Sequence, residues 1–536
     1  MSEVLQRPIV ASAPESVTDD GALGSYLPAV LPIFAAIAVV ILRAYVGGNG
    51  FISDAGLVML ALASYLTAAV FLLTNLYAPS STAQRFGMFL TSFGAFLNLS
   101  AWGVRWLAAR DREIEVLIRE GGGEMPWFFR YIPFANLYDL SVAFAFGAAI
   151  TTLFIARRRG FDFLGAVSLP LASLILLLAI FIGSDFIDLP PILDSYWRPI
   201  HVGTASLAYG VALVCFAVGV MYLLKDGVRT EAMAITSSIF ALAVIGSISN
   251  FGVFTTGIYS ASTVLVDPAG RMPTPLRVDL PYVGALLVLS GLLLVGVIAL
   301  FGTYLAKSSE TARMWGHRLL HLSLVTQAIA VALYVSQVKT IKDVLTLNMD
   351  TGQFARVGAW VAERGIGMTP DQVAQMGTPE RVQLATNFVQ DNGRALALSM
   401  NANPVELAAL ITALAATLFV ILFSFRTERI RAALPSLERL DSLMYKTAGV
   451  TFALLAVLLI TGAIWANESW GRPWGWDPKE TGAFVAWLTY GIYLHTRIAR
   501  GWTGRRSAYF ALAGFLFILF TYLGVSYLLP GLHSYA

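Results

Sequence analysis

Long apolar segments recur along the whole chain, with short polar stretches between them. About thirteen of these segments approach 20 residues, the length at which an α-helix crosses the hydrocarbon core of a bilayer. The pattern therefore predicts an all-α, polytopic transmembrane helical bundle. The expected spans lie near residues 27–46, 55–77, 86–108, 136–156, 163–184, 200–224, 232–256, 280–306, 316–337, 405–425, 443–466, 480–499 and 507–529.

Composition supports the membrane class. Of the 536 residues, 57% are hydrophobic and 13% are charged, with a mean hydropathy of +0.70. Soluble domains carry about a quarter charged residues. The first apolar segment follows a long polar stretch and lacks a small-residue cleavage pattern, so we expect a span there and no cleavable signal peptide. The single cysteine, Cys215, allows no internal disulfide and no Cys-x-x-Cys-His motif.

Lys and Arg cluster in alternate connections between the spans. Cytoplasmic loops of membrane proteins are enriched in these residues, so the basic connections should lie on the cytoplasmic side. The N-terminus is then expected inside and the C-terminus outside. The basic connections fall near residues 157–159, 225–229, 307–313, 426–439 and 497–506.

Two connections on the expected outer side are too long to be simple turns. Residues 109–135 carry mixed charge, and residues 338–404 contain amphipathic stretches that predict a small helical cap. The charges of this cap balance, which argues against binding of nucleic acid or another polyanion.

One short outer connection is unusually rich in tryptophan. It reads WANESWGRPWGWDPKET and places Trp465, Trp470, Trp474 and Trp476 around Asp477. An interfacial anchor would explain single indoles spread over several helix ends. Four indoles in one loop instead favour a flat apolar surface for a large planar ligand.

Two histidines flank this tryptophan loop on the outer side. His201 starts the sixth span, and His533 follows the last one. Two neutral imidazoles on either side of an aromatic surface could ligate a heme iron from both faces. The alternative for each residue taken alone is a solvated surface side chain.

Three other histidines lie nearer the cytoplasmic side. His495 is sixteen residues beyond Lys479, about 24 Å deeper along a helix, so any ligand there would occupy a second, inner position. Its alternative role is to cap a helix C-terminus. His317 and His321 lie one helical turn apart at the inner start of the ninth span, where they could also simply face lipid head groups.

The last hundred residues resemble the CcsA (ResC) family, heme-handling membrane proteins with a tryptophan-rich WWD signature. The matching strings are WANESWGRPWGWDPKET, YLHTR, GWTGRRSA and GLHSYA, in the family's order. Upstream, NLYD at 136–139 and SYWRPIHV at 195–202 are also similar to family elements.

The resemblance implies a holocytochrome c synthase (heme lyase) activity that attaches heme b to the Cys-x-x-Cys-His motif of apocytochrome c. Heme b would be both substrate and ligand, and heme translocation is expected as well. The implied partners are a CcsB (ResB) membrane subunit and thiol-reducing pathway proteins. The implied location is a bacterial inner or thylakoid-type membrane, with the active face outside the cytoplasm.

Residue roles follow from the family motifs. His201 and His533 would be the outer iron ligands, and His495 would contribute to an inner heme site with a histidine of the partner. The four tryptophans of the loop would cover the macrocycle.

Polar residues around the same motif have expected roles too. Arg198, Arg472 and Lys479 are candidates to bind the heme propionates. Asp477 either belongs to the catalytic site or caps the helix that starts at Pro478.

The chain departs from the family pattern in three ways. Gly482 stands where members usually have another Trp, and Pro473 replaces an aromatic residue before Trp474. About 200 extra residues with four added spans carry His317 and His321, one of which could supply the inner ligand that the partner normally brings. The expected division is 1–84 (tail and accessory spans), 85–230 (family-like part with His201), 231–439 (insertion with cap) and 440–536 (WWD core).

Two other functional classes remain open on the sequence. A transmembrane b-type cytochrome would need histidine pairs facing each other across helices at two depths. A secondary transporter would be expected to show repeats and Gly/Pro-broken helices in matching halves.

Overall fold

The computed structural model describes residues 26–46, 53–119, 121–123, 128–158, 160–184, 186, 191–249, 251–267, 270–280, 282–340, 351–392, 397–399 and 404–525. Within these residues, twelve helices are long and apolar enough to cross a membrane. A further helix, α17 (Pro478–Arg500), is long enough at 23 residues but more polar. The prediction of an all-α polytopic bundle is confirmed, and the chain is an integral membrane protein.

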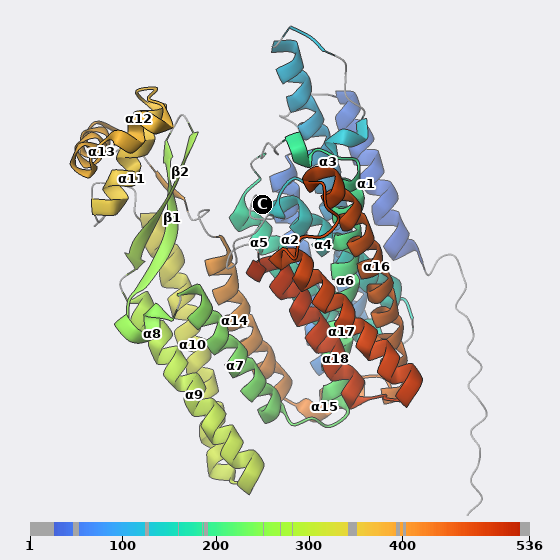
Figure 1. Cartoon of the computed structure of the whole chain (residues 1–536). Coiled ribbons are helices and arrows are strands. Elements are labelled where there is room, and N and C mark those ends of the chain that lie inside the picture. The colour runs from blue at the N-terminus through green and yellow to red at the C-terminus, as the bar shows by residue number, and fades with distance from the viewer. Residues whose placement is uncertain are drawn as a thin grey trace, which may run out of the picture.

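The main bundle joins two parts of the chain that are far apart in sequence (Figure 1). Helix α6 is central, because it packs along α4, α16 and α18. The bundle contains α1 (Leu27–Val46), α2 (Asp54–Tyr77), α3 (Ser81–Arg119), α4 (Leu137–Ala156), α5 (Gly165–Ile182), α6 (Trp197–Lys225), α16 (Leu437–Trp470), α17, α18 (Arg505–Leu519) and the π-helical turn η7 (Phe520–Gly524).

A second bundle stands beside the main one and has its own hydrophobic core. It meets the main bundle where α14 packs on α5 and where the Tyr77 hydroxyl donates to the Leu422 carbonyl. The short helix α15 (Thr427–Ala433) leads back to α16. The second bundle contains α7 (Thr230–Ile248), α8 (Gly252–Thr256), α9 (Val283–Lys307), α10 (Glu310–Thr340) and α14 (Pro404–Ser424).

A cap of mixed structure lies on one end of the second bundle (Figure 1). Its helices are α11 (Thr351–Arg364), α12 (Pro370–Gln375) and α13 (Thr378–Asn392), where the sequence predicts a helical cap. They are accompanied by an unpredicted antiparallel sheet in the order β2-β1-β3, formed by β1 (Tyr259–Asp267), β2 (Gly270–Leu280) and β3 (Ala397–Ser399).

Buried Glu406 ties this sheet to the membrane helices. One of its oxygens accepts a hydrogen bond from the Ser262 amide at 3.0 Å, and the other accepts from the Ser262 hydroxyl at 2.9 Å. Tyr259 and Ala261 alternate with more exposed neighbours and face the core of the second bundle. The alternation over residues 259–262 is thus that of a half-buried strand.

Two predicted spans have different limits in the structure. Helix α3 continues to Arg119, well past the predicted end at 108, because its charged tail consists largely of good helix formers such as Arg, Glu and Leu. The span predicted over 232–256 ends at Ile248, and the chain restarts as α8 after Phe251, which adopts a left-handed backbone with φ 59°.

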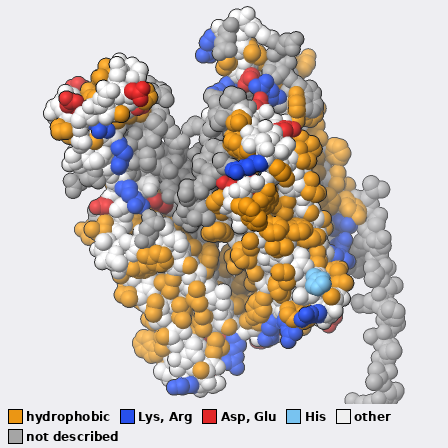
Figure 2. Space-filling model, in the orientation of Figure 1, with side chains coloured by type: hydrophobic (Ala, Val, Ile, Leu, Met, Phe, Trp, Pro, Cys, Tyr) orange, Lys and Arg blue, Asp and Glu red, His pale blue; other side chains and the backbone are white. Residues whose placement is uncertain are grey.

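Basic side chains gather at one end of both bundles (the lower end in Figure 2). There the Lys225 ammonium donates to the Arg431 carbonyl at 2.7 Å, and the Arg505 guanidinium binds Asp226 at 2.7 Å. The connections predicted to share one side of the membrane therefore do lie at the same end of the molecule.

Candidate functional site

A pocket opens at the opposite end of the main bundle, where α6 begins, α16 ends and α17 begins. Its α6 wall consists of residues three or four positions apart, which share one helix face. Its empty space, counted together with the solvent at its open mouth, is about 1110 Å³. The lining residues are Phe134–Leu137, Leu140, Leu193, Arg198, His201, Val202, Ala205, Tyr209, Leu458, Leu459, Gly462, Ala463, Trp465, Ala466, Trp470, Pro473, Trp474, Lys479, Glu480, Ala483 and Thr521.

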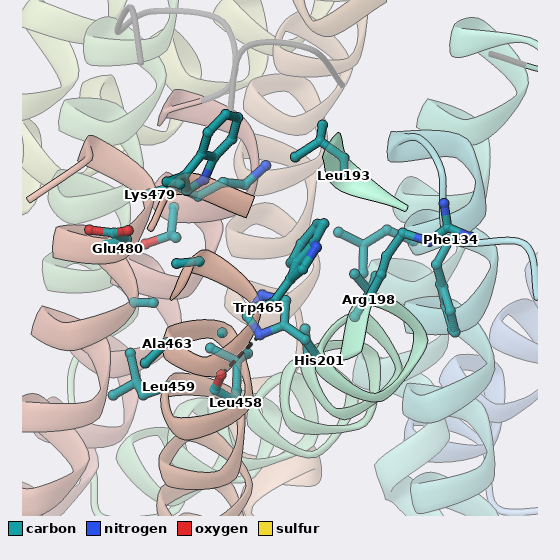
Figure 3. Close-up of a pocket in the computed structure, with 18 of the residues that line it drawn as sticks. Phe134, Leu193, Arg198, His201, Leu458, Leu459, Ala463, Trp465, Lys479 and Glu480 are labelled. Carbon is teal, nitrogen blue, oxygen red and sulfur yellow. Dashed lines mark hydrogen bonds between the residues drawn. The ribbon is translucent and has the colours of Figure 1, made fainter. Parts of the chain in front are cut away.

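His201 lies on the floor of this pocket beside Trp465 (Figure 3). Its Nδ1 donates to the Leu458 carbonyl at 2.9 Å, because a carbonyl can only accept. In the neutral imidazole Nε2 then carries the lone pair, which is the form that binds a metal. The Trp465 ring lies 5.8 Å from the His201 ring, centroid to centroid. The hydrogen bond to α16 thus fixes both the orientation and the tautomer of the ring.

Gly462 makes room for this imidazole. A Cβ at position 462 would lie 2.7 Å from Cε1 and 2.9 Å from Nδ1 of His201, closer than carbon atoms approach without displacement. The glycine therefore allows the α6 histidine to lie directly against α16.

The tryptophans divide into two groups in the structure. Trp465, Trp470 and Trp474 line the pocket. Trp476 does not line it: its side chain is 69% exposed, and its ring meets the edge of Trp474 at 5.7 Å. The backbone of Trp476 is left-handed, with φ 57°, a strained conformation for a bulky residue. The predicted indole surface is therefore made by three of the four tryptophans.

Asp477 caps α17, as predicted. Its carboxylate accepts from the Lys479 amide at 3.1 Å, and the Glu480 carboxylate reaches back to the Asp477 amide at 3.2 Å, with Pro478 in the first turn. Glu480 also accepts from the Gly475 amide at 2.8 Å. This capping box holds the tryptophan loop on the end of the helix.

Asp477→Ala is expected to lower the free energy of unfolding by about 1 kcal/mol, the usual effect of losing a helix cap, and to loosen the loop. Asp477→Asn should retain most of the stability and activity, because asparagine caps equally well. Thermal unfolding of the detergent-solubilised chain and a heme-attachment assay would measure both. An Asn variant as inactive as the Ala variant would show that the carboxylate charge itself is needed.

Two cations lie on opposite sides of the pocket (Figure 3). Arg198 comes from the start of α6, is buried, and donates to the Arg130 carbonyl at 3.2 Å. Lys479 comes from the first turn of α17. Arg472, the third predicted cation, is exposed and outside the lining, with its guanidinium beside Gly475.

Gly482 does not leave a gap in the pocket wall. A Cβ at position 482 would lie 2.5 Å from Oγ1 of Thr521, a lining residue in the π-helical turn η7. The space that a family-typical Trp would take is thus filled by the close approach of η7 to α17.

Of the remaining predicted histidines, those that the structure describes lie away from the pocket. His533 lies outside the described residues. His495 is exposed on α17, near its basic end. His317 and His321 belong to α10 in the second bundle, where Nε2 of His317 lies 3.6 Å from the buried Glu231 carboxylate. These contacts favour a structural role for His317.

Sequence reasoning missed one wall of the pocket. Residues 134–137, just before α4, line it opposite the tryptophan loop, and Leu193 and Thr521 complete it. The NLYD string at 136–139 stood out in the sequence, but nothing in its spacing placed it beside the loop some 330 residues later.

Fold and site together define a class of polytopic membrane proteins that place an imidazole and several indoles in one pocket at the end of a helical bundle. Comparison with known proteins finds a family model that matches two segments of the chain. Residues 134–264 and 404–533 match the family model of the cytochrome c assembly protein.

Curated relatives agree with the family match. The chain is 61% identical over 98 residues to cytochrome c biogenesis protein CcsA of Prochlorococcus marinus (strain MIT 9515), and 57% over 98 residues to CcsA of Synechococcus sp. (strain RCC307). It is 54% identical over 99 residues to CcsA of Guillardia theta. Each alignment covers 18% of this chain and 31–33% of the relative, so the chain spans about a third of the length of these relatives. The chain is therefore similar to the CcsA family of cytochrome c assembly proteins over these two segments.

Proposed function

We propose that this chain binds heme in the pocket at the end of the main bundle and presents it for covalent attachment to apocytochrome c. Similarity to this family supports a role in cytochrome c maturation and the involvement of heme. The observation that carries the proposal is the His201 imidazole, which the Leu458 carbonyl holds in the pocket wall beside the Trp465 indole.

The pocket suits a porphyrin chemically. Its walls are aromatic and aliphatic, which fits a flat macrocycle, and Arg198 and Lys479 fit its two carboxylates. The indole N–H of Trp465 is buried and has no hydrogen-bond partner among the described residues. A buried donor without an acceptor is costly, so a bound group that accepts there would stabilise the pocket.

The chain's contribution to the reaction is positioning. In thioether formation each cysteine sulfur bonds to a vinyl carbon, and a proton goes to the neighbouring carbon, so no strong acid or base is required of the protein. Arg198 or Lys479 would bind the carboxylates of the macrocycle and so orient the ring in the pocket. Holding reacting groups in one geometry can supply several kcal/mol of the barrier, roughly 7–11 at best.

His533 is proposed as the second iron ligand, on the family motif alone. The exchange of one of the two histidines for the histidine of the Cys-x-x-Cys-His segment would release the product. The proposed partners are a CcsB-like membrane subunit, apocytochrome c and thiol-reducing proteins, with the pocket outside the cytoplasm because the basic loops lie at the other end of the molecule.

An inner heme position at His495 is the second part of the proposal. His495 is exposed on the same outward face of α17 as Leu488 and Ile492, both exposed, so a ligand or partner could reach it from the bilayer. In a span, an ionisable side chain on such a face points to a function.

His495→Ala is expected to reduce the heme that co-purifies with the chain by at least about twofold, because one iron ligand is lost. Heme per purified chain, measured by absorbance after solubilisation, tests this. Tyr509→Ala is the matched control, since it removes another exposed ring, from α18 of the same bundle. Unchanged heme content in His495→Ala would remove the inner site from the proposal.

A further inference from the structure

The wall of the pocket formed by residues 134–137 has no regular secondary structure except at Leu137, the first residue of α4. It connects the 3₁₀ turn η2 (Phe128–Tyr131) to the start of α4. Its position therefore depends on side chains from elsewhere. One turn of α3, which carries Trp102, Arg105 and Trp106, contacts the wall directly at Phe134 and otherwise acts through Asp139 and Phe128.

Arg105 is the centre of this turn. Its side chain is 2% exposed, and its Nε donates to Asp139. Its Nη1 donates to Asp54 at 3.0 Å and to the Ser184 carbonyl at 2.7 Å. The guanidinium also lies over the Tyr138 ring, 4.5 Å from its centroid. The planar guanidinium group of Arg105 thus joins α3 to α2, to α4 and to the segment that follows α5.

Asp139 connects Arg105 to the pocket wall. The carboxylate that binds Arg105 also accepts from the Ala135 amide at 2.9 Å. The Asp139 amide in turn donates to the side chain of Asn136 at 3.0 Å, which caps α4. Ala135 and Asn136 both line the pocket.

The two tryptophans hold the preceding part of the wall. Trp102 packs on the pocket residue Phe134 with 5.4 Å between ring centroids, and the Trp106 indole donates to the Phe128 carbonyl at 3.2 Å. The same segment provides the Arg130 carbonyl that orients the pocket cation Arg198.

The ion pairs of Arg105 with Asp54 and Asp139 add little net stability to the bundle. They bury one guanidinium with two carboxylates, and burial of charges costs as much as their attraction returns, so apolar residues of the same volume would hold the helices equally well. Apolar packing, however, does not fix the orientation of a neighbouring polar group. A planar guanidinium binds at fixed angles, and a lysine ammonium does not.

We propose that Arg105 is a positioning residue for the heme pocket, acting through Asp139 on the 134–137 wall. This inference rests on the proposed function, because it assigns Arg105 to the same pocket. It places the determinant of heme orientation on α3, which contributes no residue to the pocket lining.

The test is a hemin titration of the purified full chain in detergent, followed by heme absorbance per folded chain. The part of the hemin binding that is lost in His201→Ala is assigned to the pocket. Arg105→Lys keeps the charge but not the fork, and Asp139→Asn keeps the size but weakens the acceptor. Each is expected to weaken this part of the binding about tenfold, and added imidazole should not restore it because His201 is intact.

A matched control comes from a second ion pair with a buried arginine. Arg43, also 2% exposed, binds Asp111 at 3.1 Å between α1 and α3, and neither residue lines the pocket. Arg43→Lys and Asp111→Asn should change hemin affinity less than twofold. The inference is overturned if Arg105→Lys binds hemin as the unmodified chain does, or if the control pair weakens binding equally. If His201→Ala itself removes no part of the hemin binding, the proposed function fails instead.

Discussion

Replacing His201 with alanine is expected to lower holocytochrome c formation at least about tenfold, and added imidazole should partly restore it. The variant loses the nitrogen that the structure orients into the pocket, while the indole walls, Arg198 and Lys479 remain. Loss of a metal's direct ligand exceeds the roughly 10- to 100-fold effects seen for residues that only support a ligand. Covalent heme on a co-expressed c-type cytochrome, normalised to the amount of chain, is the measurement.

The matched control for His201 is Leu207→Ala on the same helix. Leu207 is exposed and lies outside the pocket lining, so its variant should mature cytochromes normally. Normal maturation by His201→Ala without imidazole would rule out iron ligation by this residue. Stable, stoichiometric heme that is reduced by a quinol would instead favour the b-type electron-transfer class.

Gly462→Ala is expected to lower heme attachment by up to about a hundredfold, although it adds only one methyl group. The new Cβ would lie 2.7 Å from the His201 ring, so the ring must move by about 1 Å and give up its bond to Leu458. A displacement of about 1 Å at a reacting centre is enough for a loss of that size. The same maturation assay measures it, together with the heme absorbance spectrum.

Gly449→Ala provides the comparison for Gly462. Both glycines belong to α16, but a Cβ at position 449 meets nothing within 4 Å. This control variant should be as active as the unmodified chain, and alanine in place of glycine should even favour the helix slightly. Equal activity of the two alanine variants would mean that the His201 ring is not held where the structure places it.

The membrane helices were predictable because each is a long apolar segment whose burial is specified locally. The capping role of Asp477 was also readable, since the cap, the proline and Glu480 lie within four residues. The β1–β2 hairpin was not predicted, because its apolar alternation is short and lies between two much longer apolar helices.

The pocket was only partly predictable for a different reason. The sequence indicated that His201 and the tryptophan loop share an outer face, but not which indoles point inward. Trp476 faces away because its left-handed backbone turns the chain into α17, a property of the turn that the residue's identity does not reveal. The 134–137 wall reaches the pocket through the packing of α4 against α6, which no local pattern encodes.

The contact between Lys225 and Arg431 brings the two ends of the segment that forms the second bundle together. The polypeptide leaves the main bundle at the end of α6 and comes back at α15, and these two points touch. A linker of about four residues, which reaches about 13 Å, would therefore reconnect them after excision of everything between. The second bundle and its cap could therefore be removed at a single surface turn, although the family match extends into them over residues 230–264 and 404–424.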